Sequence, residues 1–191
     1  RPLDLSWEDQ NIPAIVQAWH LGSKSGDAIA QVLYGDYNPS GKLTMSFPRN
    51  VGQVPVYYNF KNTGRPSTSI EQVTNSGYAD VENSPLYSFG YGLSYTEFKY
   101  SDFEISSSNM TKDSKINASI RVTNTGKFKG EEVVQLYLRD IVGSIARPMK
   151  ELKGFKKIEL NPGESKIVNF EIENSLLEFY SYNNIWESEP G

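Results

Sequence analysis

The fold is decided by one stretch of the sequence, Ser84-Pro85-Leu86-Tyr87-Ser88-Phe89-Gly90-Tyr91-Gly92-Leu93-Ser94-Tyr95-Thr96-Glu97-Phe98. From position 87 to position 95, large apolar or aromatic residues alternate with small ones. Alternate side chains of an extended chain point to opposite faces, so one face would be an aromatic row and the other nearly bare backbone. Such a segment can lie between two bodies, with rings packed into one and main chain against the other. Because the composition differs on its two sides, residues 84–98 are predicted to be an inter-domain junction rather than an ordinary strand broken by glycines.

Helix signals fill the segment before this junction. Ser6 and Asp9 have the spacing of a capping box, and Pro13 predicts the first turn of a helix that runs to Ala18. A second helix is predicted where apolar residues recur at helical spacing between positions 28 and 33, with Gly35 as its C-terminal cap. A short strand is predicted at 43–47. We interpret residues 1–83 as the C-terminal part of an α/β domain, whose remaining strands should lie upstream.

Residues 49–83 form a long loop rich in Asn, Ser, Thr, Gly and Pro, and loops of this length are usually functional or mobile. After the junction the pattern changes to alternating strands, around Ala118–Val122, Val134–Leu138 and Val168–Ile172. Turns at Asn124-Thr125-Gly126 and Asn161-Pro162-Gly163 separate them. This spacing predicts that residues 99–191 form an all-β, immunoglobulin-like antiparallel sandwich.

Composition excludes several classes of function. The chain has 191 residues, a formal net charge of -4, no cysteine and one histidine. Without a basic patch, nucleic acid is not an expected partner. No apolar run approaches the roughly 20 residues of a membrane helix, so no membrane partner is expected. One histidine with no cysteine cannot form a familiar transition-metal cage, and neither a metal nor another cofactor is predicted.

The junction motif resembles that of family 3 glycoside hydrolases of the β-glucosidase type, in which it joins an α/β second domain to a fibronectin type III-like domain. Two further segments resemble the end of that second domain: Gly26-x-x-x-Ala30-x-x-Leu33-x-Gly35 and Asn38-Pro39-Ser40-Gly41-Lys42-Leu43. Three resemble its fibronectin type III-like domain: Val122–Gly126, Gly130–Tyr137 and Lys150–Phe155. The resemblance implies a parent enzyme that hydrolyses terminal β-linked sugars with retention. It also suggests a secreted or periplasmic location and implies that the sandwich lacks its last strand.

Glycoside hydrolysis generally requires two carboxyl groups across the scissile bond. Each carboxylate weighed for this role is better interpreted as a capping or solvated group; they are Asp4, Glu8, Asp9, Asp36, Glu71, Asp80, Glu82, Glu131 and Glu132. The resemblance implies a nucleophilic Asp in an N-terminal barrel and an acid/base Glu earlier in the second domain, and no position here matches either. No catalytic residue is therefore assigned, and this chain alone is predicted to be inactive.

Four residues are candidates for sugar binding: Trp19, Tyr57, Tyr58 and Arg65. Aromatic faces stack on sugar rings, and a guanidinium group donates several hydrogen bonds to hydroxyls. The predicted partners are the carbohydrate substrate and the upstream catalytic domains of the same polypeptide, which this chain would complete and brace. Two alternatives remain open, a stand-alone carbohydrate-binding module and a structural immunoglobulin-like module. Binding to immobilised glucans would favour the first of these.

Overall fold

The computed structural model describes residues 1–66 and 76–190, so part of the predicted loop, with Glu71, lies outside the described residues. The chain divides into two compact units, Arg1–Tyr58 with Asn62–Leu93, and Asn59–Lys61 with Ser94–Gly191. The division between Leu93 and Ser94 falls within residues 84–98, whose role as a junction stays a prediction. None of the described helices has both the length and the hydropathy that crossing a membrane requires.

The first unit contains helices α1 (Ser6–Asn11) and α2 (Ser25–Tyr34) and a short 3-10 turn, η1 (Val51–Gln53). Helix α2 confirms the prediction from its apolar spacing. Gly35 ends it in the left-handed conformation at φ 81°, and its amide donates to the Val32 carbonyl at 3.2 Å. Although α2 has an apolar stripe, none of its residues is buried within the described chain.

The start of the chain differs from its prediction in two ways. Asp4, not Ser6, stabilises the start of α1, because its carboxylate accepts from both the amide (3.0 Å) and the hydroxyl (2.7 Å) of Ser6. These bonds favour the carboxylate form and lower the pKa of Asp4. The predicted helix from Pro13 to Ala18 is wrong, because the segment is not helical. Residues 13–18 are irregular and mostly exposed, so a short apolar run that begins with proline is not by itself enough to indicate a helix.

The aromatic stretch pairs with the segment predicted as a strand at 43–47, within the same unit. The Leu43 amide donates to the Tyr91 carbonyl, and the Gly90 amide donates to the Leu43 carbonyl, both at 2.7 Å. Phe47 forms an antiparallel bridge with Tyr87. The predicted flat alternation is wrong, however, because the chain turns at Phe89-Gly90, where Gly90 has φ 82°. The turn brings the Tyr87 and Tyr91 rings into a stack 5.4 Å apart.

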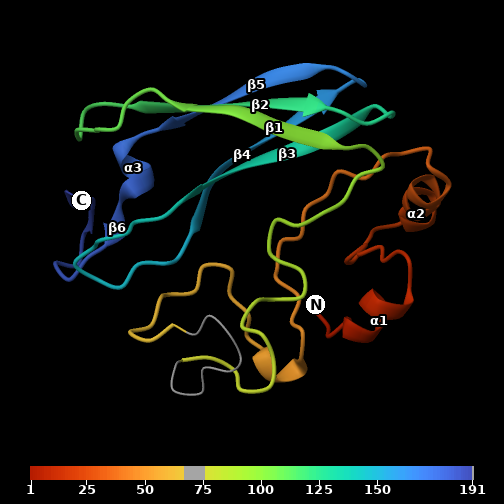
Figure 1. Ribbon diagram of the computed structural model, residues 1–191, viewed down its shortest axis with the longest axis horizontal. Coiled ribbons are helices and arrows are strands. Elements are labelled where there is room, and N and C mark those ends of the chain that lie inside the picture. The colour runs from red at the N-terminus through yellow and green to blue at the C-terminus, as the bar shows by residue number, and fades with distance from the viewer. Residues whose placement is uncertain (67–75, 191) are drawn as a thin grey trace. The chain divides into compact units, whose positions relative to one another are not determined.

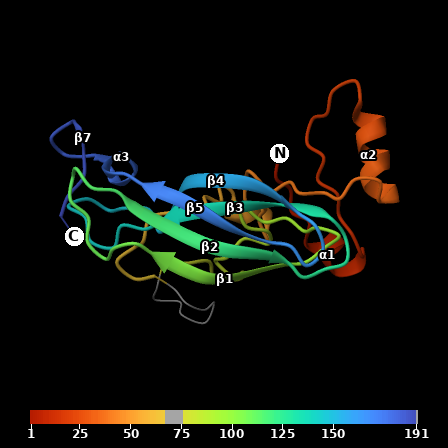
Figure 2. The same ribbon diagram turned by 90° about the horizontal axis from the view of Figure 1, so that it is seen from above.

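The second unit is the predicted antiparallel sandwich. Its strands are β1 (Phe98–Ile105), β2 (Ile116–Asn124), β3 (Gly130–Leu138), β4 (Glu151–Leu160), β5 (Ser165–Ile172), β6 (Phe179–Tyr180) and β7 (Trp186–Glu187), with helix α3 (Asn174–Leu177) before β6. One sheet has the order β1-β2-β5, a second pairs β3 with β4, and β6 pairs with β7. Figure 1 shows the first two sheets as separate layers, and Figure 2 shows β2 between β1 and β5.

The sandwich core takes side chains from both layers. Val122 and Val168 come from the three-stranded sheet, and Val134 and Leu160 come from the β3-β4 pair; all four are at most 3% exposed. In β2, β3 and β5 the more buried residues are every second residue, as the alternation of apolar residues in the sequence predicts. The fold class, an α/β segment followed by an all-β sandwich, is thereby confirmed.

A buried asparagine organises the turn that follows β2. The Asn124 side chain is fully buried; it accepts from the Thr96 hydroxyl at 2.7 Å and donates to the carbonyls of Phe128 (2.8 Å) and Leu160 (3.0 Å). It also accepts from the Gly126 amide at 3.1 Å. These groups belong to separate segments of the sandwich, and the Asn124 side chain joins them because both its oxygen and its nitrogen are hydrogen-bonded.

Candidate functional site

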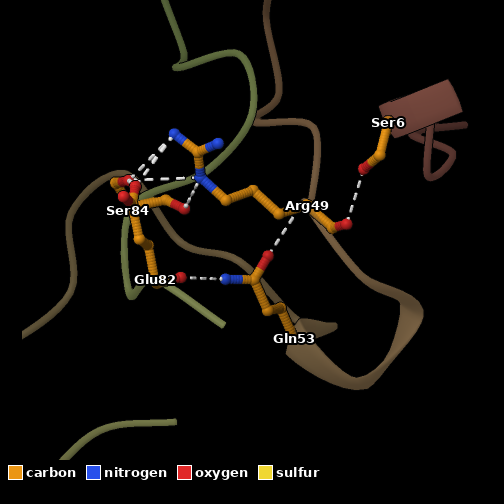
Figure 3. Close-up of polar contacts among 5 residues, drawn as sticks. All are labelled: Ser6, Arg49, Gln53, Glu82 and Ser84. Carbon is orange, nitrogen blue, oxygen red and sulfur yellow. Dashed lines mark hydrogen bonds and ion pairs between the residues drawn. The ribbon is translucent and has the colours of Figure 1, made fainter. Parts of the chain in front are cut away.

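The long loop that carries three of the four candidate sugar-binding residues is closed at its base by a polar network (Figure 3). The Arg49 guanidinium donates to the Ser84 carbonyl at 3.1 Å and lies 3.2 Å from a Glu82 carboxylate oxygen. The Ser6 hydroxyl, at the start of α1, lies 2.7 Å from the Arg49 carbonyl oxygen and shares its proton between this oxygen and the Asp4 carboxylate. The two ends of the loop are therefore joined to each other and to the first helix.

Gln53 is the buried centre of this network. Its side chain, 1% exposed, accepts from the Arg49 amide at 2.6 Å and donates to the Glu82 carbonyl at 2.6 Å. Its own carbonyl accepts from the Tyr78 hydroxyl at 3.1 Å. Because the buried Gln53 side-chain amide is hydrogen-bonded to both ends of the loop, it holds them in one arrangement. Sequence reasoning missed Gln53, because an isolated glutamine in a polar stretch resembles an exposed loop residue.

Tyr57 and Tyr58 follow this base and have different environments. Tyr58 is half-buried and stacks on Phe89, with ring centroids 4.1 Å apart and planes 15° apart. Tyr57 is 64% exposed. One ring is therefore part of the packing of the unit, whereas the other is accessible to a ligand.

Trp19 lies in a different aromatic group. Its ring contacts Phe47 at 6.1 Å between centroids, and its backbone has a positive φ of 52°. The residue is 39% exposed, so much of it is covered by the unit. Its neighbour His20 is exposed. The structure thus places Trp19 beside Phe47 and Tyr58 beside Phe89.

Arg65 is exposed, and its carbonyl accepts from the Ser76 amide at 2.7 Å, on the far side of residues 67–75. Its guanidinium is the candidate hydrogen-bond donor to a sugar. Tyr57 and Arg65 are consequently the two candidates that the described part of the loop leaves exposed.

Four of the carboxylates considered as catalysts, Asp9, Glu82, Glu131 and Glu132, have structural partners. Asp9 accepts from the Tyr87 hydroxyl at 2.5 Å, and Glu82 pairs with Arg49. In the sandwich, Glu131 pairs with Lys157 at 2.7 Å, and Glu132 accepts from the Tyr100 hydroxyl at 2.8 Å. Burial, reinforced by Glu132, raises the pKa of Tyr100.

These contacts give those four carboxylates structural roles. Residues 1–66 and 76–190 also contain no cluster of three or more His, Cys, Asp or Glu side chains placed to hold a metal ion.

Comparison with known proteins supplies the wider context. Residues 1–95 match the glycosyl hydrolase family 3 C-terminal domain, and residues 132–191 match the fibronectin type III-like domain. A periplasmic β-glucosidase of Salmonella typhimurium is 53% identical over 192 residues, which cover 100% of this chain and 25% of that protein. A β-xylosidase of Formosa agariphila is 46% identical over 176 residues, 90% of this chain and 23% of that protein.

A solved structure agrees with these relatives. The crystal structure of a β-glucosidase from Listeria innocua in complex with glucose superposes with a TM-score of 0.92 and 40% identity, covering 100% of this chain and 27% of that one. The chain therefore spans about a quarter of the length of the relatives it matches. It belongs to glycosyl hydrolase family 3, with residues 1–95 in the family's C-terminal domain and residues 132–191 in its fibronectin type III-like domain.

Proposed function

We propose that this chain completes and braces the catalytic assembly of a family 3 enzyme that hydrolyses terminal β-linked sugars, of the β-glucosidase type. The catalytic carboxyl groups are supplied by upstream domains of the same polypeptide. Support comes from relatives named β-glucosidases that match both units, and from the structural contacts that engage Asp9 and Glu82.

One observation carries the bracing role, the apolar surface that the first unit leaves exposed. Leu33 of α2 is 62% exposed, and Ile12, Val16 and Leu21 of the preceding segment are between 42% and 50% exposed. All four lie within residues 12–33, and large exposed apolar side chains of this kind are typical of a face that another body covers. The upstream part of the same α/β domain is the partner that this surface fits.

Within that assembly we assign sugar contacts to the loop of residues 49–66. Tyr57 would stack on a sugar ring and Arg65 would donate to hydroxyls, while the Arg49–Gln53–Glu82 network holds the loop in place. Tyr58 and Trp19 pack on Phe89 and Phe47, in two separate ring contacts of the first unit.

The two alternatives from the sequence are not favoured. A stand-alone carbohydrate-binding module or a structural immunoglobulin-like module does not account for a first unit with exposed apolar helix residues. The matching relatives extend through both units. For location we propose the periplasm or secretion, on the strength of the Salmonella relative's name.

Complementation tests the proposal. The Salmonella β-glucosidase without its matching 192 residues would be co-expressed with this chain, and hydrolysis of an aryl β-glucoside would be measured. We expect activity only when both parts are present. Leu33→Asp should abolish it, because a carboxylate would enter an apolar contact. Asp27→Asn, a charge change on an exposed residue of the same helix, is the matched control and should complement like the parent.

Failure of every variant, including the parent chain, would contradict the proposed role, provided that the chain is recovered folded. In a complementing pair, Tyr57→Ala should raise KM more than it lowers kcat. Unchanged kinetics would remove Tyr57 from the site without affecting the bracing role.

A further inference from the structure

Three residues of the long loop belong to the second unit, whereas the loop residues on either side of them belong to the first. We call these three, residues 59–61, the bridging segment. Within the second unit, the Met149 amide donates to the Phe60 carbonyl at 2.8 Å, and Lys61 forms an antiparallel bridge with Pro148. The bridging segment is therefore paired through its main chain with the stretch that leads into β4.

Main-chain pairing, and not burial of side chains, characterises the bridging segment. Phe60 is 55% exposed, and Asn59 and Lys61 are exposed as well. A short extended segment can attach to neighbouring backbone through its main-chain groups whatever side chains it carries. The bond from the Met149 amide to the Phe60 carbonyl is thus the contact that ties this part of the loop to the second unit.

The partner of the bridging segment is itself held firmly. Arg147, two residues before Met149, has a side chain that is only 11% exposed, and it forms ion pairs with Glu151 at 2.9 Å and Asp140 at 3.4 Å. Its guanidinium also lies over the buried Phe179 ring, 4.3 Å from the centroid. A planar guanidinium with partners on several sides fixes the backbone next to it. Met149 therefore presents its amide from a rigid support.

The two exposed sugar-binding candidates flank the bridging segment. Tyr57 lies two residues before it, and Arg65 lies four residues after it. Tyr58, between Tyr57 and the segment, is stacked on Phe89. Four residues of chain span at most about 14 Å, so fixing residues 59–61 restricts where the side chains on both sides can be. Loss of the main-chain bond would give this part of the loop more freedom before a sugar binds.

We propose that the fibronectin type III-like unit positions the sugar-binding loop. The Met149 amide, supported by Arg147, fixes the bridging segment and through it Tyr57 and Arg65. Met149 is a positioning residue and does not itself touch the sugar. This inference rests on the proposed function, in which Tyr57 and Arg65 contact the substrate. It gives the second unit a part in substrate binding in addition to bracing.

Nuclear magnetic resonance of the 191-residue chain tests the bond itself. A scalar coupling across the hydrogen bond, from the Met149 amide nitrogen to the Phe60 carbonyl carbon, would identify the acceptor. We also expect the Met149 amide to exchange its hydrogen at least about tenfold more slowly than an amide of an unstructured chain. Exchange at the unstructured rate, with no coupling, would overturn the proposal.

Kinetics test the consequence for binding. The Salmonella β-glucosidase, with this chain in place of its matching 192 residues, would hydrolyse an aryl β-glucoside. Met149→Pro removes the amide and should raise KM about threefold to tenfold, with a smaller change in kcat. Met149→Leu keeps the amide and should restore the KM of the parent. If Met149→Pro does not fold, Arg147→Lys replaces it, with a smaller rise in KM expected because the bonds of the guanidinium are reduced.

A double mutant separates positioning from general destabilisation. Tyr57→Ala combined with Met149→Pro should raise KM by less than the product of the two single effects, because both changes disturb the same contact. An effect equal to the product, or a parental KM in folded Met149→Pro, would overturn the proposal. Near-ultraviolet circular dichroism establishes that each variant is folded. An inactive parent chimaera would contradict the proposed function instead, and the coupling and exchange of the Met149 amide would still decide whether the second unit holds the loop.

Discussion

The Gly41 carbonyl oxygen lies where a side chain on Gly92 would begin, since a β-carbon built at Gly92 falls 2.2 Å from that oxygen. Real β-carbons do not approach this closely, so any substitution at Gly92 must move the backbone. Gly92→Ala should therefore destabilise the first unit by roughly 1–3 kcal/mol. The midpoint of urea unfolding measures the effect.

Gly26→Ala is the control for this substitution. A β-carbon at Gly26 meets nothing within 4 Å, and the residue lies inside α2. Alanine favours a helix over glycine, so this variant should unfold at the same urea concentration as the parent or slightly above it. Equal destabilisation by both variants would show that the approach of Gly92 to Gly41 is not tight in solution.

Two phenylalanines of the first unit should differ in importance. Phe47 is 2% exposed and contacts both Trp19 and Tyr87, so Phe47→Ala should cost about 3–5 kcal/mol. Phe89 is half-buried and stacks on Tyr58, so Phe89→Ala should cost less, about 1–3 kcal/mol. Thermal unfolding and limited proteolysis of residues 84–98 would compare them. If Phe89→Ala melts and resists cleavage like the parent, this stretch is an exposed linker.

Asn124→Asp should be among the most damaging isosteric changes in the sandwich. The new carboxylate oxygen would face the Phe128 and Leu160 carbonyls, which now accept from the Asn124 amide. Losing these bonds in a buried site should cost about 3 kcal/mol or more. Asn117→Asp, at an exposed position on the same strand, should stay within about 0.5 kcal/mol of the parent. A small, equal effect at both positions would argue that water reaches Asn124.

Tyr87 gives the first unit an alkaline pH dependence. Its hydrogen bond to Asp9, together with partial burial and the Asp9 charge, raises the pKa of Tyr87 to about 12. The unfolded value is about 10. The folded state binds the proton more tightly, so this contribution is fully present below about pH 10 and is lost as the pH rises through the folded value.

Phenolate absorbance during an alkaline titration should show two late-ionising tyrosines, Tyr87 and Tyr100, and one of the two late ionisations should disappear in Tyr87→Phe. Asp9→Asn should move that ionisation to lower pH, because it removes the carboxylate that accepts the bond. If Tyr87→Phe instead loses an ionisation near pH 10 and Asp9→Asn leaves the curve unchanged, the contact between Tyr87 and Asp9 is absent in solution.

Much of the fold could be predicted because its strands and second helix are locally consistent. Ala118, Ile120 and Val122 alternate in β2 with polar residues, and α2 combines a helical apolar spacing with Gly35 as its cap. In each case the spacing of the apolar residues and the residues at the following turn predict the same secondary structure, a strand for β2 and a helix for α2. The segment from Pro13 offered only a short apolar run, which is compatible with two structures.

The polar centres could not be predicted because they depend on partners far away in the sequence. Gln53 joins residues 49 and 82, and Asn124 joins residues 96, 128 and 160. Nothing in their neighbouring residues marks them as buried.

The central claim is that this chain completes a β-glucosidase without supplying its catalytic groups. Hydrolysis of an aryl β-glucoside by the purified 191-residue chain, with no other part of the enzyme present, tests this most directly. The account predicts a rate equal to that of buffer. Turnover that survives repurification, and that disappears when one carboxylate of this chain is replaced by its amide, would contradict it.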